Sequence, residues 1–75
     1  MPKLPRISSR VVIRVLEKLG FEVVRQTGSH VVMQKVTTEG NIGCVVPLHR
    51  ELKVGTLSGV LKQARVSVNE FIGQL

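Results

Sequence analysis

The order of hydrophobic periodicities along the chain limits its fold more than any other feature. Near the N-terminus, apolar residues recur at helical spacing and predict a helix over about residues 9–19, which Ser8 or Ser9 would cap and Gly20 would end. Helical spacing returns after residue 54 and predicts a second helix, through Leu57, Val60, Leu61 and Ala64. The residues between these helices are rich in β-branched side chains, so the pattern changes from helix to strand and back.

Three short strands are predicted between the two helices. Residues 21–26 and 30–36 form the first two, and residues 27–29 form the turn that joins them. Residues 37–43 contain two glycines and Asn41 and are predicted to form a loop or a hairpin tip. The third strand is then limited to residues 44–46, because Pro47 cannot donate to a ladder. After the second helix, a capping box from Ser67 to Glu70 predicts a short third helix.

The resulting order, α-β-β-β-α with a small C-terminal helix, predicts an α+β fold in one domain over residues 1–75. The simplest packing is a three-stranded antiparallel sheet with two helices on one face, which is the arrangement of double-stranded RNA-binding domains. A chain of 75 residues cannot enclose a large cofactor cavity or form a two-domain cleft. Any chemistry must therefore come from a few side chains on an exposed surface.

Charge and cysteine content indicate the kind of partner and the compartment. Lys and Arg number 11 against 5 acidic residues, a net charge of +6, which exceeds what solubility requires and favours nucleic acid or an acidic protein as partner. The single cysteine, Cys44, cannot form an internal disulfide and is expected to be a buried small hydrophobe. No signal-peptide pattern or membrane-spanning run is found, so we expect a cytoplasmic protein.

The turn Gly28-Ser29-His30 carries the most informative polar residues. Imidazole exchanges protons near neutral pH, and the ribose 2′-OH can itself act as the nucleophile in RNA cleavage. One imidazole on a basic surface is the minimum for cleavage without a metal, so His30 is a candidate general base or general acid, with Gly28 and Ser29 positioning it or bonding phosphate. The alternative is that His30 is an ordinary exposed residue of the strand. The chain has no Asp, and its Glu, His and Cys residues lack metal-site spacing, so no metal or cofactor is expected.

Five further residues are candidates for binding RNA. His49 lies in the segment before the second helix and is a second acid–base candidate. Arg50 and Lys53 flank the start of that helix, where free N–H groups and cations together favour phosphate. Lys35 could stabilise a phosphorane, but strand parity directs it to the face opposite His30 unless a bulge intervenes. Lys62 completes the basic surface together with Lys35, Arg10, Arg14 and Arg25.

Taken in order, the motifs resemble those of the HicA family of bacterial toxins over nearly the whole chain. The segments that carry the resemblance are Gly28-Ser29-His30-Val31-Val32-Met33, Val46-Pro47-Leu48-His49, Gly55-Thr56-Leu57 and Leu61-Lys62-Gln63-Ala64, followed by Ser67 and Glu70-Phe71. Each segment alone is common, but their order and spacing in a short basic chain are specific.

The resemblance implies an mRNA interferase with a double-stranded-RNA-binding-like fold. It places the family's catalytic histidine at His30 and implies metal-independent cleavage of mRNA, a block of translation, and neutralisation by a HicB-type antitoxin. Two other functions share the fold and the charge. A non-catalytic RNA-binding module would bind RNA without cleaving it. A protein-interaction domain with a basic face would bind nucleic acid only weakly, and salt would abolish that binding.

Overall fold

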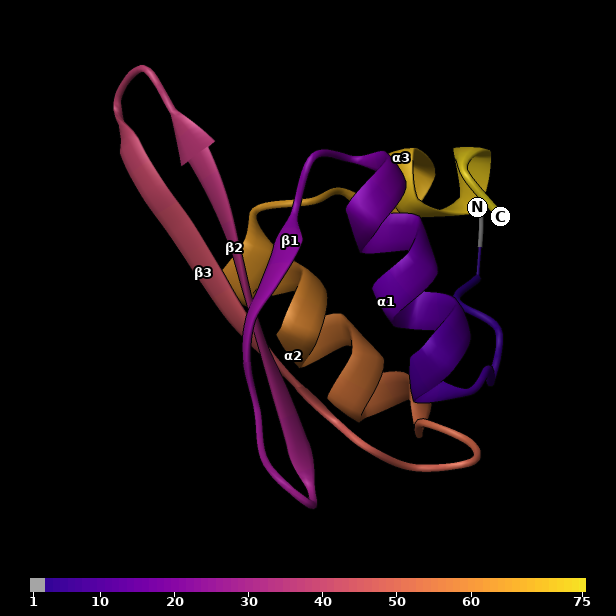
Figure 1. Cartoon of the computed structure of the whole chain (residues 1–75). Helices are drawn as coiled ribbons and strands as arrows, with labels where there is room; N and C mark the ends of the chain where they lie inside the picture. The colour runs from indigo at the N-terminus through magenta and orange to yellow at the C-terminus, as the bar shows by residue number, and fades with distance from the viewer. Residues whose placement is uncertain (1–2) are drawn as a thin grey trace.

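The chain forms a three-stranded antiparallel sheet with helices packed against one of its faces (Figure 1). A computed structural model describes residues 3–75, so Met1 and Pro2 lie outside the described part of the N-terminal segment. The elements in chain order are α1 (Ser9–Lys18), β1 (Glu22–Gln26), β2 (His30–Thr37), β3 (Gly40–Pro47), α2 (Val54–Ala64) and α3 (Val68–Gly73). The predicted α+β class and double-stranded-RNA-binding-like arrangement are confirmed.

The first helix follows directly from its sequence. The hydroxyl oxygen of Ser8 accepts a hydrogen bond from the Val11 N–H at 3.3 Å, which satisfies one free donor of the first turn. The apolar stripe then buries Val12 and Leu16 completely against the sheet and the other helices. Gly20 adopts φ of +101° just past the helix end, a conformation that glycine tolerates best. The predicted helix is therefore confirmed, ending one residue early at Lys18.

Strand β2 is the central strand and pairs regularly with β3 along its whole length. Val31 and Met33 on β2 are buried toward the helices, whereas His30 and Val32 alternate with them and point to the outer face. Strand β1 is an edge strand whose pairing with β2 shifts by one residue between Val23 and Arg25. The sheet thus has one face covered by helices and one open face.

Of the two alternatives predicted for residues 37–43, the structure has the hairpin tip, but a tighter one than predicted. Strand β2 continues to Thr37 and β3 begins at Gly40, so only a tight hairpin turn separates them. Gly40, at φ of +128°, forms the turn, whereas Gly43 sits inside the ladder opposite Gln34. Ladder pairing with a central strand outweighs the low strand propensity of glycine and asparagine, so β3 is longer than the predicted 44–46.

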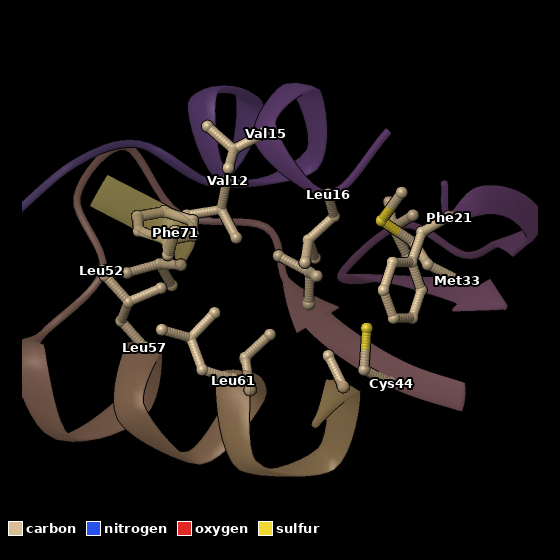
Figure 2. Close-up of a cluster of buried hydrophobic side chains, with 14 residues drawn as sticks. Val12, Val15, Leu16, Phe21, Met33, Cys44, Leu52, Leu57, Leu61 and Phe71 are labelled. Atoms are coloured by element: carbon tan, nitrogen blue, oxygen red, sulfur yellow. The ribbon is translucent and has the colours of Figure 1, made fainter. Parts of the chain in front are cut away.

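One continuous aliphatic core lies between the sheet and the helices. Leu16 from α1, Leu61 from α2 and Phe71 from α3 meet there with side chains of the sheet (Figure 2). Cys44 is buried in the same cluster, as predicted, and burial raises the pKa of its thiol to about 11. The thiol therefore stays protonated at neutral pH and behaves as a small apolar group.

The C-terminal third of the chain closes the core. Helix α2 contacts β3, and the side-chain oxygen of Gln63 accepts the Val45 backbone N–H at 3.0 Å on the outer edge of that strand. The predicted capping box is confirmed: Ser67 and Glu70 exchange side-chain-to-backbone hydrogen bonds, both 3.1 Å long. Within residues 3–75, no helix is both long enough and apolar enough to cross a bilayer.

Candidate functional site

The β1–β2 hairpin tip presents the predicted turn residues to solvent. The Thr27 hydroxyl accepts the backbone N–H of Ser29 at 3.3 Å and that of His30 at 3.0 Å. The Thr27 N–H in turn donates to the His30 carbonyl at 2.9 Å. These bonds fix the tip locally, so the exposed His30 at the start of β2 projects from an ordered backbone.

A side-chain hydrogen bond orients the imidazole of His30. The Ser29 Oγ lies 2.8 Å from Nδ1 of His30. The proton of this bond can belong to either atom, so the contact is compatible with either neutral tautomer and with the imidazolium. In each case the bond occupies Nδ1 and leaves Nε2 as the ring nitrogen that can exchange a proton with a bound molecule.

Gly28 differs from Gly20 and Gly40, whose positive φ values favour glycine. Its φ is not positive, so an L-residue could adopt the same conformation. A Cβ placed on Gly28 would meet no atom within 4 Å. The backbone next to His30 therefore lies open to the approach of a large molecule, and nothing in the fold itself requires glycine there.

The register of the sheet places a cation on its outer face, the face to which His30 points. Arg25 pairs with Val32, which points to the same face as His30, so Arg25 lies diagonally across from the imidazole on the neighbouring strand. This placement results from the bulge at Val24, since an uninterrupted pairing would have put Arg25 opposite the inward-facing Val31. The sequence indicated Arg25 only as part of the general basic surface, because no local signal marks the bulge that brings it to the face of His30.

The segment after β3 is tied to the same end of the sheet. His30 pairs with Pro47, and the Leu48 N–H donates to the Ser29 carbonyl at 2.8 Å. His49 and Arg50 follow, both exposed, so the structure brings these two candidates close to the tip. The positions of His49 and Arg50 relative to His30 are set by this backbone hydrogen bond and not by contacts between the side chains.

Ser9 holds this segment and was not predicted to do so. Its buried hydroxyl donates to the His49 carbonyl at 2.8 Å and accepts the His49 N–H at 3.0 Å, and its own N–H donates to the same carbonyl at 3.1 Å. The sequence indicated Ser8 or Ser9 only as a helix cap. Ser8 is the N-cap, and Ser9 instead joins residues that are 40 positions apart.

A groove of about 630 Å³ lies between these elements. The start of α1, the inner side of β1 and the segment after β3 contribute its walls. The lining residues are Ser8, Ser9, Arg10, Ile13, Val23, Gln26, Val31, Leu48, His49 and Arg50. None of them is acidic, and two are arginines.

The other candidate residues lie elsewhere. Lys53 is the exposed residue that precedes α2, beyond the buried Leu52. The Lys35 ammonium lies 5.9 Å from the centre of the Phe21 ring, on the helix-covered side of the sheet and about 17 Å along β2 from His30. No bulge interrupts β2 against β3, so the expected opposition of Lys35 and His30 holds. Lys62 is exposed in the last turn of α2.

Metal ligands do not gather near the tip. Across residues 3–75, no three His, Cys, Asp or Glu side chains are grouped so that they could share a metal ion. The chemistry available at this end of the sheet is therefore proton transfer by imidazole, hydrogen bonding by Ser29, and charge stabilisation by arginine.

Comparison with known proteins assigns the family. The model of the family described as HicA toxin of bacterial toxin–antitoxin systems matches residues 9–66. This chain belongs to the HicA toxin family. The match runs from the start of α1 to just past α2 and includes the β1–β2 tip, the segment after β3 and every groove residue except Ser8. No curated protein matches the chain.

Membership in the HicA family confirms the resemblance seen in the sequence. It makes the protein the toxin component of a toxin–antitoxin system, and a toxin of this kind has an antitoxin as its partner. The basic surface and the exposed β1–β2 tip are thus features of a HicA-family toxin.

Proposed function

We propose that this toxin is a metal-independent endoribonuclease that cleaves mRNA in the cytoplasm, thereby blocks translation, and is neutralised by a HicB-type antitoxin. Its one domain, residues 1–75, would suffice for activity. The observation that carries the proposal is the 2.8 Å hydrogen bond that orients an exposed imidazole, His30, at an open hairpin tip. The net charge of +6 supports a polyanionic substrate.

The proposed reaction needs only groups that the tip and the RNA provide. The ribose 2′-oxygen forms a bond to the adjacent phosphorus as its proton leaves, and the bond from phosphorus to the 5′-oxygen breaks as that oxygen gains a proton. The products are a 2′,3′-cyclic phosphate and a 5′-hydroxyl. Nε2 of His30 carries out one of the two proton transfers, and water or His49 carries out the other.

Charge stabilisation completes the proposed site. Arg25 shares the outer face with His30 and can donate hydrogen bonds to the phosphate oxygens as their charge increases. Gly28 leaves the space that the RNA backbone would fill, and Ser29 keeps the imidazole aimed at it. Of the cations proposed from sequence, Arg50 is at the same end of the sheet and is the stronger candidate for contact with neighbouring phosphates.

The deciding experiment compares wild-type toxin with His30→Ala on mRNA in the presence of EDTA. We expect the wild type to leave 2′,3′-cyclic phosphate ends and the variant to cleave at least about 100-fold more slowly, because a general acid or base contributes that much. His30 is exposed, so both proteins should show the same circular dichroism and unfolding midpoint. Equal cleavage by both would contradict the role of His30. Binding of RNA without cleavage would instead indicate an RNA-binding module.

A modified substrate distinguishes the two roles of His30. RNA with sulfur in place of the bridging 5′-oxygen has a leaving group that does not need protonation. If His30 is the general acid, His30→Ala should cleave this RNA almost as fast as the wild type. If His30 is the general base, the variant should be equally impaired on both RNAs.

A further inference from the structure

We propose that the groove beside α1 binds one nucleotide of the RNA next to the cleaved phosphate, with its base against the apolar floor and its phosphate between Arg10 and Arg50. This inference rests on the proposed ribonuclease function and adds to it a second contact surface. The groove lies on the helix-covered side of the sheet, whereas His30 faces the outer side, so the substrate would wrap around the end of the sheet.

Continuity with the tip is the first argument. Val31, which lines the groove, directly follows His30, and Gln26 of the groove pairs with Val31 across the hairpin. Leu48, also in the lining, is bonded to the Ser29 carbonyl. The groove therefore begins within one residue of the proposed catalytic imidazole, at the end of the sheet where β1 ends and β2 begins.

The shape and chemistry of the lining give the second argument. Ile13, Val23 and Val31 form an apolar floor suited to the face of a base, and Gln26 offers an amide that can bond base edges. A volume of about 630 Å³ lies in the range of small-molecule sites and is ample for one nucleotide. Val23 is 43% exposed although it points toward the helices, because α1 leaves this part of β1 uncovered.

Charge gives the third argument and favours RNA over a protein segment. Arg10 and Arg50, both exposed, line the groove, and no carboxylate does. The nearest acidic residue in sequence, Glu51, lies 3.9 Å from Arg6 in an exposed ion pair and so is engaged by another cation. An uncompensated pair of arginines above an apolar floor complements a phosphate joined to a base.

Ser9 would act as a positioning residue for this subsite. Through its three hydrogen bonds with His49 it fixes the segment that carries Arg50 against the start of α1. The separation of Arg10 and Arg50 therefore depends on a buried hydroxyl rather than on a mobile loop. The subsite would be formed before RNA arrives, which reduces the ordering cost of binding.

The test measures RNA binding separately from cleavage. In the His30→Ala background, the affinity for a fluorescein-labelled ten-nucleotide RNA of mixed sequence is measured by anisotropy at several salt concentrations. Two groove variants, Arg50→Gln and Val23→Glu, are compared with two matched controls, Arg65→Gln and Val36→Glu. Both controls are exposed and lie outside the groove, and Val36 is at the opposite end of β2.

We expect each groove variant to weaken binding about tenfold, which equals about 1.4 kcal/mol, and each control to weaken it less than threefold. Arg50→Gln should also lower the slope of log affinity against log salt by about 0.7, the value for one phosphate contact on a single strand. Equal losses in all four variants would overturn the subsite, because the RNA would then be held by overall charge. Unchanged RNA affinity with lost antitoxin binding would also overturn it and assign the groove to the protein partner.

Measurements on the same groove variants, with His30 intact, distinguish failure of the subsite from failure of the proposed ribonuclease function. If toxin with His30 intact binds RNA through the groove but never cleaves it, the subsite stands and the ribonuclease does not. If toxin with His30 intact cleaves and the groove variants bind like the controls, the ribonuclease stands and the subsite is overturned.

Discussion

The two hairpin tips of the sheet are built alike and differ in what they offer. At the β1–β2 tip, the Thr27 hydroxyl bonds the backbone of Ser29 and His30. At the β2–β3 tip, the Thr37 hydroxyl accepts the Glu39 N–H at 3.2 Å and donates to the Gly40 carbonyl at 2.6 Å. Because β2 connects them, the tips lie at opposite ends of the sheet (Figure 1).

The glycines show how the tips differ. Gly40 has φ of +128°, so the chain needs glycine there to turn. Gly28 has an ordinary φ and open space around it, so the fold alone does not explain it. One tip is thus determined by backbone geometry, whereas the other carries an oriented imidazole beside a surface kept free of side chains. The contrast teaches that a turn glycine indicates function only where its conformation does not require it.

The largest effect expected from this contrast is on stability. Gly40→Ala should lower the free energy of unfolding by about 1–3 kcal/mol, because an L-residue at that φ is strained. Gly28→Ala should change it by less than about 0.5 kcal/mol and instead reduce RNA cleavage. Urea unfolding and cleavage assays on both variants would check this. Equal stability losses would show that both tips have the same backbone requirement.

A smaller effect is expected from the hydroxyl that orients the imidazole. Ser29→Ala removes the bond to Nδ1 of His30 and should lower the cleavage rate about tenfold, as expected for a hydrogen bond to a charged group. Glu39→Ala, at the matching position of the other tip, should leave the cleavage rate unchanged. A Ser29→Thr variant should recover activity if the hydroxyl is what matters.

The smallest effect is expected away from both tips, at the capping box of α3, and concerns the stability of the fold at low pH. Hydrogen bonds from Ser67, with the Lys35 charge adding to them, lower the pKa of Glu70 in the folded state. Because the pKa of Glu70 is lower in the folded than in the unfolded state, the ionised carboxylate stabilises the fold at pH values above the ordinary pKa of 4.5. This stabilisation is lost as the pH falls from 4.5 through the lowered pKa of the folded state. Glu70→Gln keeps the capping geometry without the charge, so its unfolding midpoint should fall less between pH 6 and pH 3. A steeper fall would contradict this sign.

Local sequence signals determined most of the elements. The stripe of α1, the capping box of α3 and the strand character of β2 depend on neighbours within a few residues, so they could be read without the fold. His30 was identified in the same way, because a glycine-containing turn before a β-branched run exposes the residue at the strand start. The start of β3 was predicted too late because Gly40, Asn41 and Gly43 have low strand propensity, and pairing with β2 makes this segment a strand.

Tertiary structure alone decided which residues surround the imidazole. The bulge at Val24 turns Arg25 to the outer face, and the register of β2 and β3 brings Pro47 beside His30. The Ser9 hydroxyl reaches His49 across 40 residues, and the groove is formed where α1, β1 and the segment after β3 meet. These contacts join residues distant in sequence, and a change of one residue in strand pairing would move each side chain to the other face. The sequence by itself determined the imidazole at the hairpin tip, and packing determined the cations and the groove around it.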